Sequence, residues 1–218
     1  FLKRYYWWAY ISPKAVNFFE RRWLVNLILL GNYDRLARAA IDRIQVEAGS
    51  SVLQIACAYG ELTSILARKI EAADAQLHVV DVLPIQLANL SGKLGADSQV
   101  QLSCMDSCDL KFGDEAFDSI LLFFLMHEQP DEVRQKTLME ARRVLKPGGK
   151  IIVADYSSPS AWNPMRYFMY SLLKRLEPFA LDLWVKDALS WLPKPLSAKV
   201  CNRKTFFGGM YQVLEIMK

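Results

Sequence analysis

Short apolar segments alternate with helix-like segments between residues 51 and 155, and this alternation constrains the fold more than any other feature. Each apolar segment is long enough for one buried strand, and the segments between them carry apolar residues at helical spacing. Strands that alternate with helices form a parallel, doubly wound α/β sheet. The expected strands are Ser51–Ala56, Leu77–Asp81, Val100–Ser103, Phe117–Phe124 and Ile151–Asp155, and the expected helices are Glu61–Ile70, Ile85–Leu94 and Asp131–Val144.

Helical segments flank this core on both sides. Apolar residues recur at helical spacing from Pro13 to Leu30 and predict one helix that ends at Gly31, followed by a second helix over Leu36–Ile44. Residues 160–192 predict helices inserted after the fifth strand, and Gly208-Gly209 predicts an antiparallel hairpin at the C-terminus. We therefore expect a single domain over 1–218. Its parts are N-terminal helices (1–45), a core (46–155), a helical insertion or lid (156–199) and a closing hairpin (200–218).

The composition is that of a folded α/β chain. With 218 residues, 52% of them hydrophobic and 23% charged, the chain is neither disordered nor fibrous. No stretch approaches the roughly 20 apolar residues that a membrane-spanning helix needs. The cysteines form no CxxC pair and have no histidine near them in the sequence, so we interpret them as free thiols of a reducing compartment. They are Cys57, Cys104, Cys108 and Cys201.

Charge and aromatic residues are unevenly distributed. Residues 1–43 and 156–218 each carry a net charge of +5, whereas residues 44–155 carry −6, and all six tryptophans lie in the two basic flanks. Aromatic rings beside Lys3 and Arg4 in the first ten residues are typical of a lipid headgroup boundary, which predicts a membrane surface as partner. The alternative is that these rings pack as a helical lid on the core. The modest total of +4 argues against nucleic acid as a partner.

The carboxyl ends of the strands predict a ligand site, because doubly wound sheets bind ligands there. Asp81 ends the second strand, 21 residues after Gly60, and suits hydrogen bonds to ribose hydroxyls. The residues that we expect to bind the cofactor lie in the loops after the first three strands. They are Gln54, Ala56, Ala58, Tyr59, Gly60, Asp81, Val82, Gln86, Met105, Asp106 and Ser107.

These loops resemble those of the class I S-adenosylmethionine-dependent methyltransferases over roughly residues 50–155. The resemblance implies that Asp81 binds the ribose and that Asp106 lies beside the adenine amine. A nicotinamide-dependent Rossmann enzyme shares the ribose acid, but its three-glycine phosphate loop is absent. The methyltransferases usually carry an acid in strand one and three spaced glycines, where this chain has Gln54, Ala56, Ala58 and Gly60. The change implies a retained nucleoside site beside a rebuilt site for the methionine part.

Further segments resemble the RquA family of rhodoquinone biosynthesis proteins across nearly the whole chain. This resemblance implies that the chain replaces a ring methoxy group of ubiquinone with an amino group, using S-adenosylmethionine as amino donor and Mn²⁺ as an assisting ion. It also implies a peripheral position on the cytoplasmic face of the inner membrane, or on the matrix side in a mitochondrion. The segments are YWWAY at 6–10, WLVNLIL at 23–29, VLQIACAYG at 52–60, VVDVLPIQL at 79–87, FFLMHEQP at 123–130 and EPFALDLW at 177–184.

The catalytic candidates follow the fourth and fifth strands. His127 and Glu128 suit acid–base chemistry on an attacking amine or metal binding, and Asp155 and Tyr156 face the same crevice. The structural alternative is that His127-Glu128 orients the next helix and that Asp155 caps a turn. The spacing identifies no metal ligands. The residues expected to line a quinone site are Tyr10, Trp162 and Phe168.

Two other functions remain open from the sequence. One is an S-adenosylmethionine-dependent quinone or lipid methyltransferase, against which the missing glycines weigh. The other is a non-catalytic scaffold of methyltransferase fold, against which Asp81 and Asp106 weigh.

Overall fold

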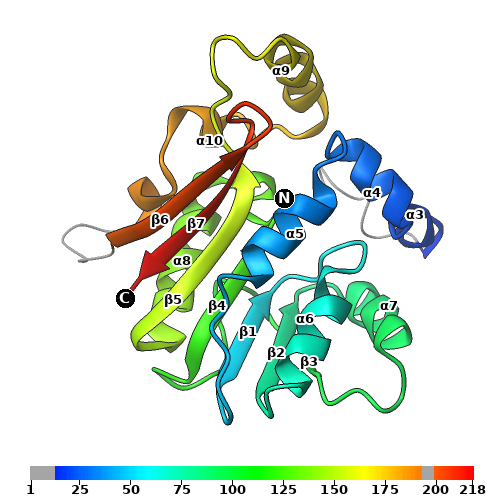
Figure 1. Ribbon diagram of the computed structural model, residues 1–218, viewed down its shortest axis with the longest axis vertical. Helices are drawn as coiled ribbons and strands as arrows, with labels where there is room; N and C mark the ends of the chain where they lie inside the picture. Colours follow the sequence, from blue (N-terminus) through cyan, green and yellow to red (C-terminus); the bar gives the residue numbers. More distant parts are fainter. Residues whose placement is uncertain (1–12, 193–198) are drawn as a thin grey trace.

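A seven-stranded sheet forms the centre of the protein in the computed structural model, which describes residues 13–192 and 199–218 (Figure 1). The strand order is β3-β2-β1-β4-β5-β7-β6; β1 to β5 are parallel, and β7 runs antiparallel to both β5 and β6. This arrangement confirms the predicted fold class. The strands are β1 Ser51–Ile55, β2 Gln76–Asp81, β3 Gln101–Cys104, β4 Phe117–Phe123, β5 Leu145–Tyr156, β6 Lys199–Phe206 and β7 Tyr211–Met217.

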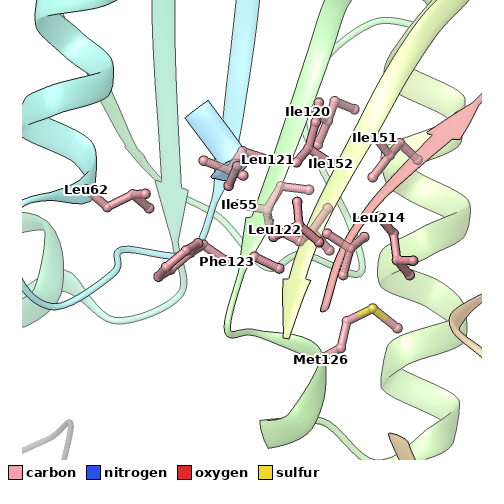
Figure 2. Packing of buried hydrophobic residues seen from close by; sticks show 14 of the residues in the cluster. Ile55, Leu62, Ile120, Leu121, Leu122, Phe123, Met126, Ile151, Ile152 and Leu214 are labelled. Carbon is pink, nitrogen blue, oxygen red and sulfur yellow. The ribbon is translucent and has the colours of Figure 1, made fainter. Parts of the chain in front are cut away.

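The central strand β4 explains why the sheet is stable. It pairs with β1 on one side and with β5 on the other, and helices cover both faces, so Ile120, Leu121 and Leu122 are fully buried. An uninterrupted apolar run is what a strand buried on both faces requires. Figure 2 shows side chains from β1, β4, β5 and β7 packed together, with Met126 beyond the end of β4.

Helices cover both faces of the sheet. In Figure 1, α5 crosses the near face over β5, whereas α8 lies behind the sheet. The pair α3–α4 and helix α9 lie beyond the end at which the parallel strands terminate, where they can bound a site. The helices are α3 Pro13–Phe19, α4 Arg22–Ile28, α5 Tyr33–Ile41, α6 Leu62–Glu71, α7 Pro84–Leu94, α8 Asp131–Val144, α9 Met165–Leu176 and α10 Asp182–Val185, with short 3₁₀ turns η1 Met126–Glu128 and η2 Ala188–Trp191.

The first predicted helix is wrong in one respect, because it is broken into α3 and α4. The backbone of Arg21 is extended (φ −65°, ψ 117°) and separates the two helices. At this break the Glu20 carboxylate contacts Gly60 and Lys93 of the core. The following helix α5 also begins and ends earlier than the expected Leu36–Ile44.

Strand β5 begins at Leu145 rather than at the expected Ile151. Leu145 pairs with Phe117 and Lys150 with Ser119, so the residues between Leu145 and Lys150 form an irregularity in the ladder. Gly148 in this segment has a φ of +75°, which suits glycine. The insertion after β5 contains α9, α10 and η2. No helix within the described part of the chain combines the length and the apolar character needed to cross a membrane.

Candidate active site

The carboxyl ends of β1 to β5 open into a cavity of about 680 Å³. Its floor is formed by the loops after the strands, and its walls by α4 and α9, which contribute mainly leucines and other aliphatic side chains, with one aromatic ring, that of Phe168. Most of its lining is therefore apolar, with polar groups gathered at the floor. A cavity of this kind suits a ligand that has one polar and one apolar part.

Asp81 lies at the floor of the cavity, at the end of β2. Its Oδ2 accepts a hydrogen bond from the backbone N–H of Cys57, and its Oδ1 accepts one from that of Leu83, both at 2.8 Å. Burial raises the pKa of the Asp81 carboxyl, and the two N–H groups oppose that rise. Each carboxylate oxygen can accept a further hydrogen bond, so the carboxylate is oriented and still able to bind two hydroxyl groups.

Asp106 and its neighbours follow β3 on the same floor. The backbone N–H of Met105 donates to the Asp81 carbonyl at 3.1 Å, which joins the two loops. The Asp106 carboxylate accepts the N–H of Cys108 at 2.9 Å, and Ser107 Oγ lies 2.8 Å from Thr137 Oγ1. Met105, Asp106 and Ser107 all line the cavity, as does Val82.

The loop after β1 is braced from behind by Gln54. Its Nε2 donates to the Ala56 carbonyl and to Thr63 Oγ1, both at 3.0 Å, and it is fully buried. Gln54 therefore supports the loop and does not line the cavity, whereas Ala56 and Ala58 do. Ala56 has a φ of +72°, a conformation that favours glycine.

Tyr59 and Gly60 form the end of this loop. Tyr59 lines the cavity, and its hydroxyl accepts a hydrogen bond from Gln86 Nε2 at 2.9 Å. A Cβ on Gly60 would lie 2.6 Å from the hydroxyl oxygen of Tyr33, so a larger residue cannot fit without displacing that ring. Tyr33 in turn donates to the Tyr59 carbonyl and accepts from the N–H of Leu62.

Glu20 is a contributor that the sequence analysis did not single out. Its carboxylate accepts hydrogen bonds from the N–H of Gly60 at 3.0 Å and from the side chains of Asn89 and Lys93, each at 2.6 Å. Beside it, Phe19 stacks on Tyr59 with ring centroids 6.2 Å apart. These contacts hold the break between α3 and α4 against the loop after β1 and against α7.

His127 and Asp155 form a buried pair on the other side of the floor. His127 Nδ1 lies 3.0 Å from Asp155 Oδ1, and the backbone N–H of His127 donates to Asp155 Oδ2 at 3.2 Å. Burial by itself lowers the pKa of His127, but the charge of Asp155 and its hydrogen bond, together with Glu177 and Glu128, raise it to about 9. The imidazole is therefore a cation at neutral pH.

Aromatic rings enclose this cation. The ring centroids of Tyr156 and Phe124 lie 5.0 and 5.7 Å from that of His127, both edge to face. Burial raises the pKa of the Tyr156 hydroxyl well above its usual range, so it stays protonated. Phe124 has a φ of +52°, which is strained for a bulky residue and places its ring in the cavity wall.

The structure thus brings together His127, Glu128 and Tyr156 along the cavity, with Asp155 directly behind the histidine. Of the residues expected to line a quinone site, Phe168 on α9 lines the cavity. Trp162 is 94% exposed and lies outside the lining, and Tyr10 lies outside the described residues. His78 packs edge to face against the rings of Phe112 and Phe117, away from the cavity lining.

Comparisons with known proteins agree with this geometry. A family model described as "Methyltransferase domain" matches residues 52–149. A demethylmenaquinone methyltransferase of Shouchella clausii is 30% identical over 77% of this chain and 71% of its own length. The chain belongs to the class I S-adenosylmethionine-dependent methyltransferase family. The ubiquinone/menaquinone biosynthesis C-methyltransferase UbiE of Hahella chejuensis is likewise 30% identical, over 67% of this chain and 59% of its own.

Other members of the methyltransferase family differ in length or share only the fold. The chain spans between 43% and 64% of the length of three further methyltransferases that it matches. The solved structure of N-methyltransferase NodS from Bradyrhizobium japonicum has a TM-score of 0.60 at 17% identity, and the match covers 88% of this chain and 97% of that one.

The expected Mn²⁺ has no group of side-chain ligands in the structure. Within residues 13–192 and 199–218, no three His, Cys, Asp or Glu side chains are arranged to hold a metal ion. The donor set therefore does not fit a protein-held Mn²⁺, and the mechanism proposed below uses none.

Proposed function

We propose that the protein binds S-adenosylmethionine and acts on a quinone ring in the cavity. The observation that carries the proposal is that one cavity contains both an oriented nucleoside-type carboxylate, Asp81, and a cationic His127 enclosed by aromatic rings. Asp81 and Asp106 would hold the ribose and adenine. The apolar walls of α4 and α9 would take the isoprenoid tail, and relatives named for demethylmenaquinone and ubiquinone methylation support a quinone as substrate.

The reaction that we propose is replacement of a ring methoxy group of ubiquinone by an amino group. When bound, S-adenosylmethionine supplies the amino nitrogen. The support is that the nucleoside side retains the features of the family, whereas the loop expected to hold the methionine part has Ala56 and Ala58 in place of glycines. In the first step a bond would form between that nitrogen and the ring carbon, the nitrogen would lose a proton, and the bond from the ring carbon to the methoxy oxygen would break, so that methanol leaves. The nitrogen would then still be bonded to the α-carbon of the donor. That bond would break in a second step by elimination, in which the donor loses a proton from its β-carbon and the nitrogen gains one, so that no oxidant is needed.

The residues of the chain have distinct roles in that step. The Nε2–H of His127 donates a hydrogen bond to a quinone carbonyl oxygen and so makes the neighbouring ring carbon more electrophilic. Asp155 holds the imidazole by Nδ1 and stabilises its positive charge. The Glu128 carboxylate accepts the proton that the nitrogen loses. Tyr156 and Phe124 pack around the imidazole and keep water from it.

Mass spectrometry with nitrogen-labelled S-adenosylmethionine tests the reaction. Ubiquinone incubated with the full chain, with and without added Mn²⁺, is expected to gain the label in its ring and to lose a methoxy group. His127→Asn should abolish the product, whereas His78→Asn should leave it. An unlabelled, methylated quinone would overturn the proposal.

The alternative is a quinone methyltransferase, which the activities that give the relatives their names favour. It predicts S-adenosylhomocysteine and a methylated ring from the same incubation. A scaffold without activity predicts that the chain does not bind the cofactor at all, which calorimetry with S-adenosylmethionine would show.

We also propose that the side formed by α4 and α9 lies on an anionic membrane surface. Both helices line the cavity, and both present apolar side chains outward, Trp23 and Leu27 from α4 and Tyr167 from α9. The exposed cations Lys174 and Arg175 lie in the last turn of α9. Rings and cations together favour an anionic headgroup layer, which would place the cavity mouth where the quinone is dissolved, on the cytoplasmic or matrix face of an inner membrane.

Vesicle flotation tests this docking. The chain is expected to float with phosphatidylcholine vesicles that contain phosphatidylglycerol, and Trp23→Ala with Leu27→Ala should reduce the floated fraction several-fold. Met139→Ala, an exposed apolar residue on α8, is the matched control. Equal flotation of the three proteins would refute the role of α4.

A further inference from the structure

Glu177 brings a third carboxylate to His127. It follows the last residue of α9, and its backbone N–H donates to the Leu173 carbonyl at 2.8 Å. Its side chain, 22% exposed, lines the cavity, and its Oε2 lies 3.9 Å from His127 Nε2. Glu177 belongs to the insertion after β5 and lies 50 residues after His127 in the sequence.

Side chains from four places in the fold face the His127 ring: β5, η1, the end of α9 and the residue that follows β4. Asp155 from β5 contacts Nδ1, and Tyr156 from the same strand contacts the ring edge. Glu128 from η1 and Glu177 from the end of α9 face Nε2, each at 3.9 Å. Phe124, after β4, closes another side without charge. Among the residues that the structure describes, the charged groups facing the ring are therefore these three carboxylates.

The distances give the two ring nitrogens different tasks. At 3.0 Å, Nδ1 is within hydrogen-bond reach of Asp155, whereas 3.9 Å is too long for Nε2 to donate to Glu128 or Glu177. The latter two act on the imidazole through their charge, which is effective at this range in a buried site. The Nε2–H is thus left available to an acceptor in the cavity.

Arg134 fixes the two segments that meet here. This fully buried guanidinium on α8 donates through Nε to the Met126 carbonyl at 2.6 Å and through Nη2 to the Phe179 carbonyl. Met126 directly precedes His127, and Phe179 follows Glu177 by two residues. One side chain therefore sets the separation of the histidine and the glutamate.

We propose that Glu177 is a positioning residue, whose carboxylate holds the His127 imidazolium with Nε2–H directed into the cavity as a donor to a carbonyl oxygen of the substrate. The identity of that acceptor rests on the proposed function, whereas the effect of Glu177 on the imidazolium does not. The role is distinct from that of Asp155, which binds the opposite nitrogen.

The chain has only two histidines, His78 and His127, so their titrations can be followed separately by ¹H–¹⁵N NMR of the imidazole nitrogens. In the full chain we expect His127 to stay protonated to well above neutral pH. Glu177→Gln should lower its midpoint by about one pH unit, in line with loss of one nearby opposite charge. His78 should not move and is the internal control.

Two further variants complete the test. Glu71→Gln removes an exposed carboxylate at the end of α6, a helix that packs on β2, and should leave both histidines unchanged. Glu177→Asp keeps the charge and should restore most of the shift, which also covers the case in which Glu177→Gln fails to fold. A His127 midpoint that is the same in Glu177→Gln as in the unaltered chain would overturn the proposal. This holds even if nitrogen label found in the quinone ring shows that the amination takes place. The shift without any amination would instead refute the proposed function alone.

Discussion

The two sides of the cavity floor are built in different ways. On the side that we propose for the nucleoside, Asp81 is oriented by backbone N–H groups of adjacent loops. On the other side, His127 depends on side chains from β5, η1 and the end of α9. The first arrangement follows from topology, whereas the second depends on a few particular residues. New chemistry can therefore arise on the second side while the first remains unchanged.

The largest expected effect comes from removing Arg134, which supports only the histidine side. Arg134→Leu would leave the Met126 and Phe179 carbonyls without this donor and would remove one ion-pair partner of Asp182, so we expect the free energy of unfolding to fall by about 4 kcal/mol. Chemical denaturation measures this change. Lys136→Leu, an exposed cation on the same helix, should change stability by less than about 0.5 kcal/mol. Similar losses of stability in both variants would contradict the role of Arg134 in joining the segments of Met126 and Phe179.

The next effect is the pH dependence that His127 confers. Its folded pKa of about 9 lies above the ordinary value near 6.5, so its contribution to stability is fully present below pH 6.5 and is lost as the pH rises through 9. We expect the free energy of unfolding to fall across this window by an amount on the order of 3 kcal/mol. Denaturation at several pH values should show this slope, and His127→Asn should abolish it. If the slope is retained in His127→Asn but lost in His78→Asn, it arises from His78 and the prediction is wrong.

Asp81 tests the nucleoside side by itself. Asp81→Ala should weaken S-adenosylmethionine binding about 10- to 150-fold, because hydrogen bonds to a charged acceptor contribute about 1.5–3 kcal/mol. Isothermal titration calorimetry measures the affinity, and Asp97→Ala, an exposed acid after α7, is the control. The pH slope of His127 should be unaffected. Unchanged affinity would place the nucleoside elsewhere.

The smallest effect separates two alanines of the same loop. Ala56 has a φ of +72°, so Ala56→Gly should relieve strain and raise stability by about 0.5–1 kcal/mol. Ala58 has no positive φ, and Ala58→Gly should lower stability by a similar amount through chain entropy. Thermal unfolding of both variants gives the signs. If both changes have the same sign, the strain at Ala56 is not what distinguishes them.

The sequence predicted the sheet well because its signals are local. The runs of β1, β2 and β4 are apolar and short, and each ends near a residue of the cavity floor. The split between α3 and α4 was missed because periodicity does not register the contacts of Glu20 with Gly60 and Lys93. The early start of β5 was missed because Pro147 and Gly148 normally end an element, whereas here they lie in an irregular part of the ladder.

The site was predictable where its residues end strands. Asp81, Asp155 and His127 lie where the alternation of strands and helices placed them. Gln54 also follows the family pattern in position, yet its side chain faces away from the cavity. Glu177 could not be found from sequence because only tertiary structure brings the end of α9 to η1.

The contacts of Gln54 limit which side chains this position can accept. Its Nε2 donates to the Ala56 carbonyl, and its amide exchanges hydrogen bonds with Thr63. A carboxylate at this position, typical of the methyltransferases that the chain resembles, has no N–H to donate and would set one oxygen against that carbonyl. Gln54→Glu alone is therefore expected to destabilise the loop after β1, because the new carboxylate would need a different partner in place of the Ala56 carbonyl.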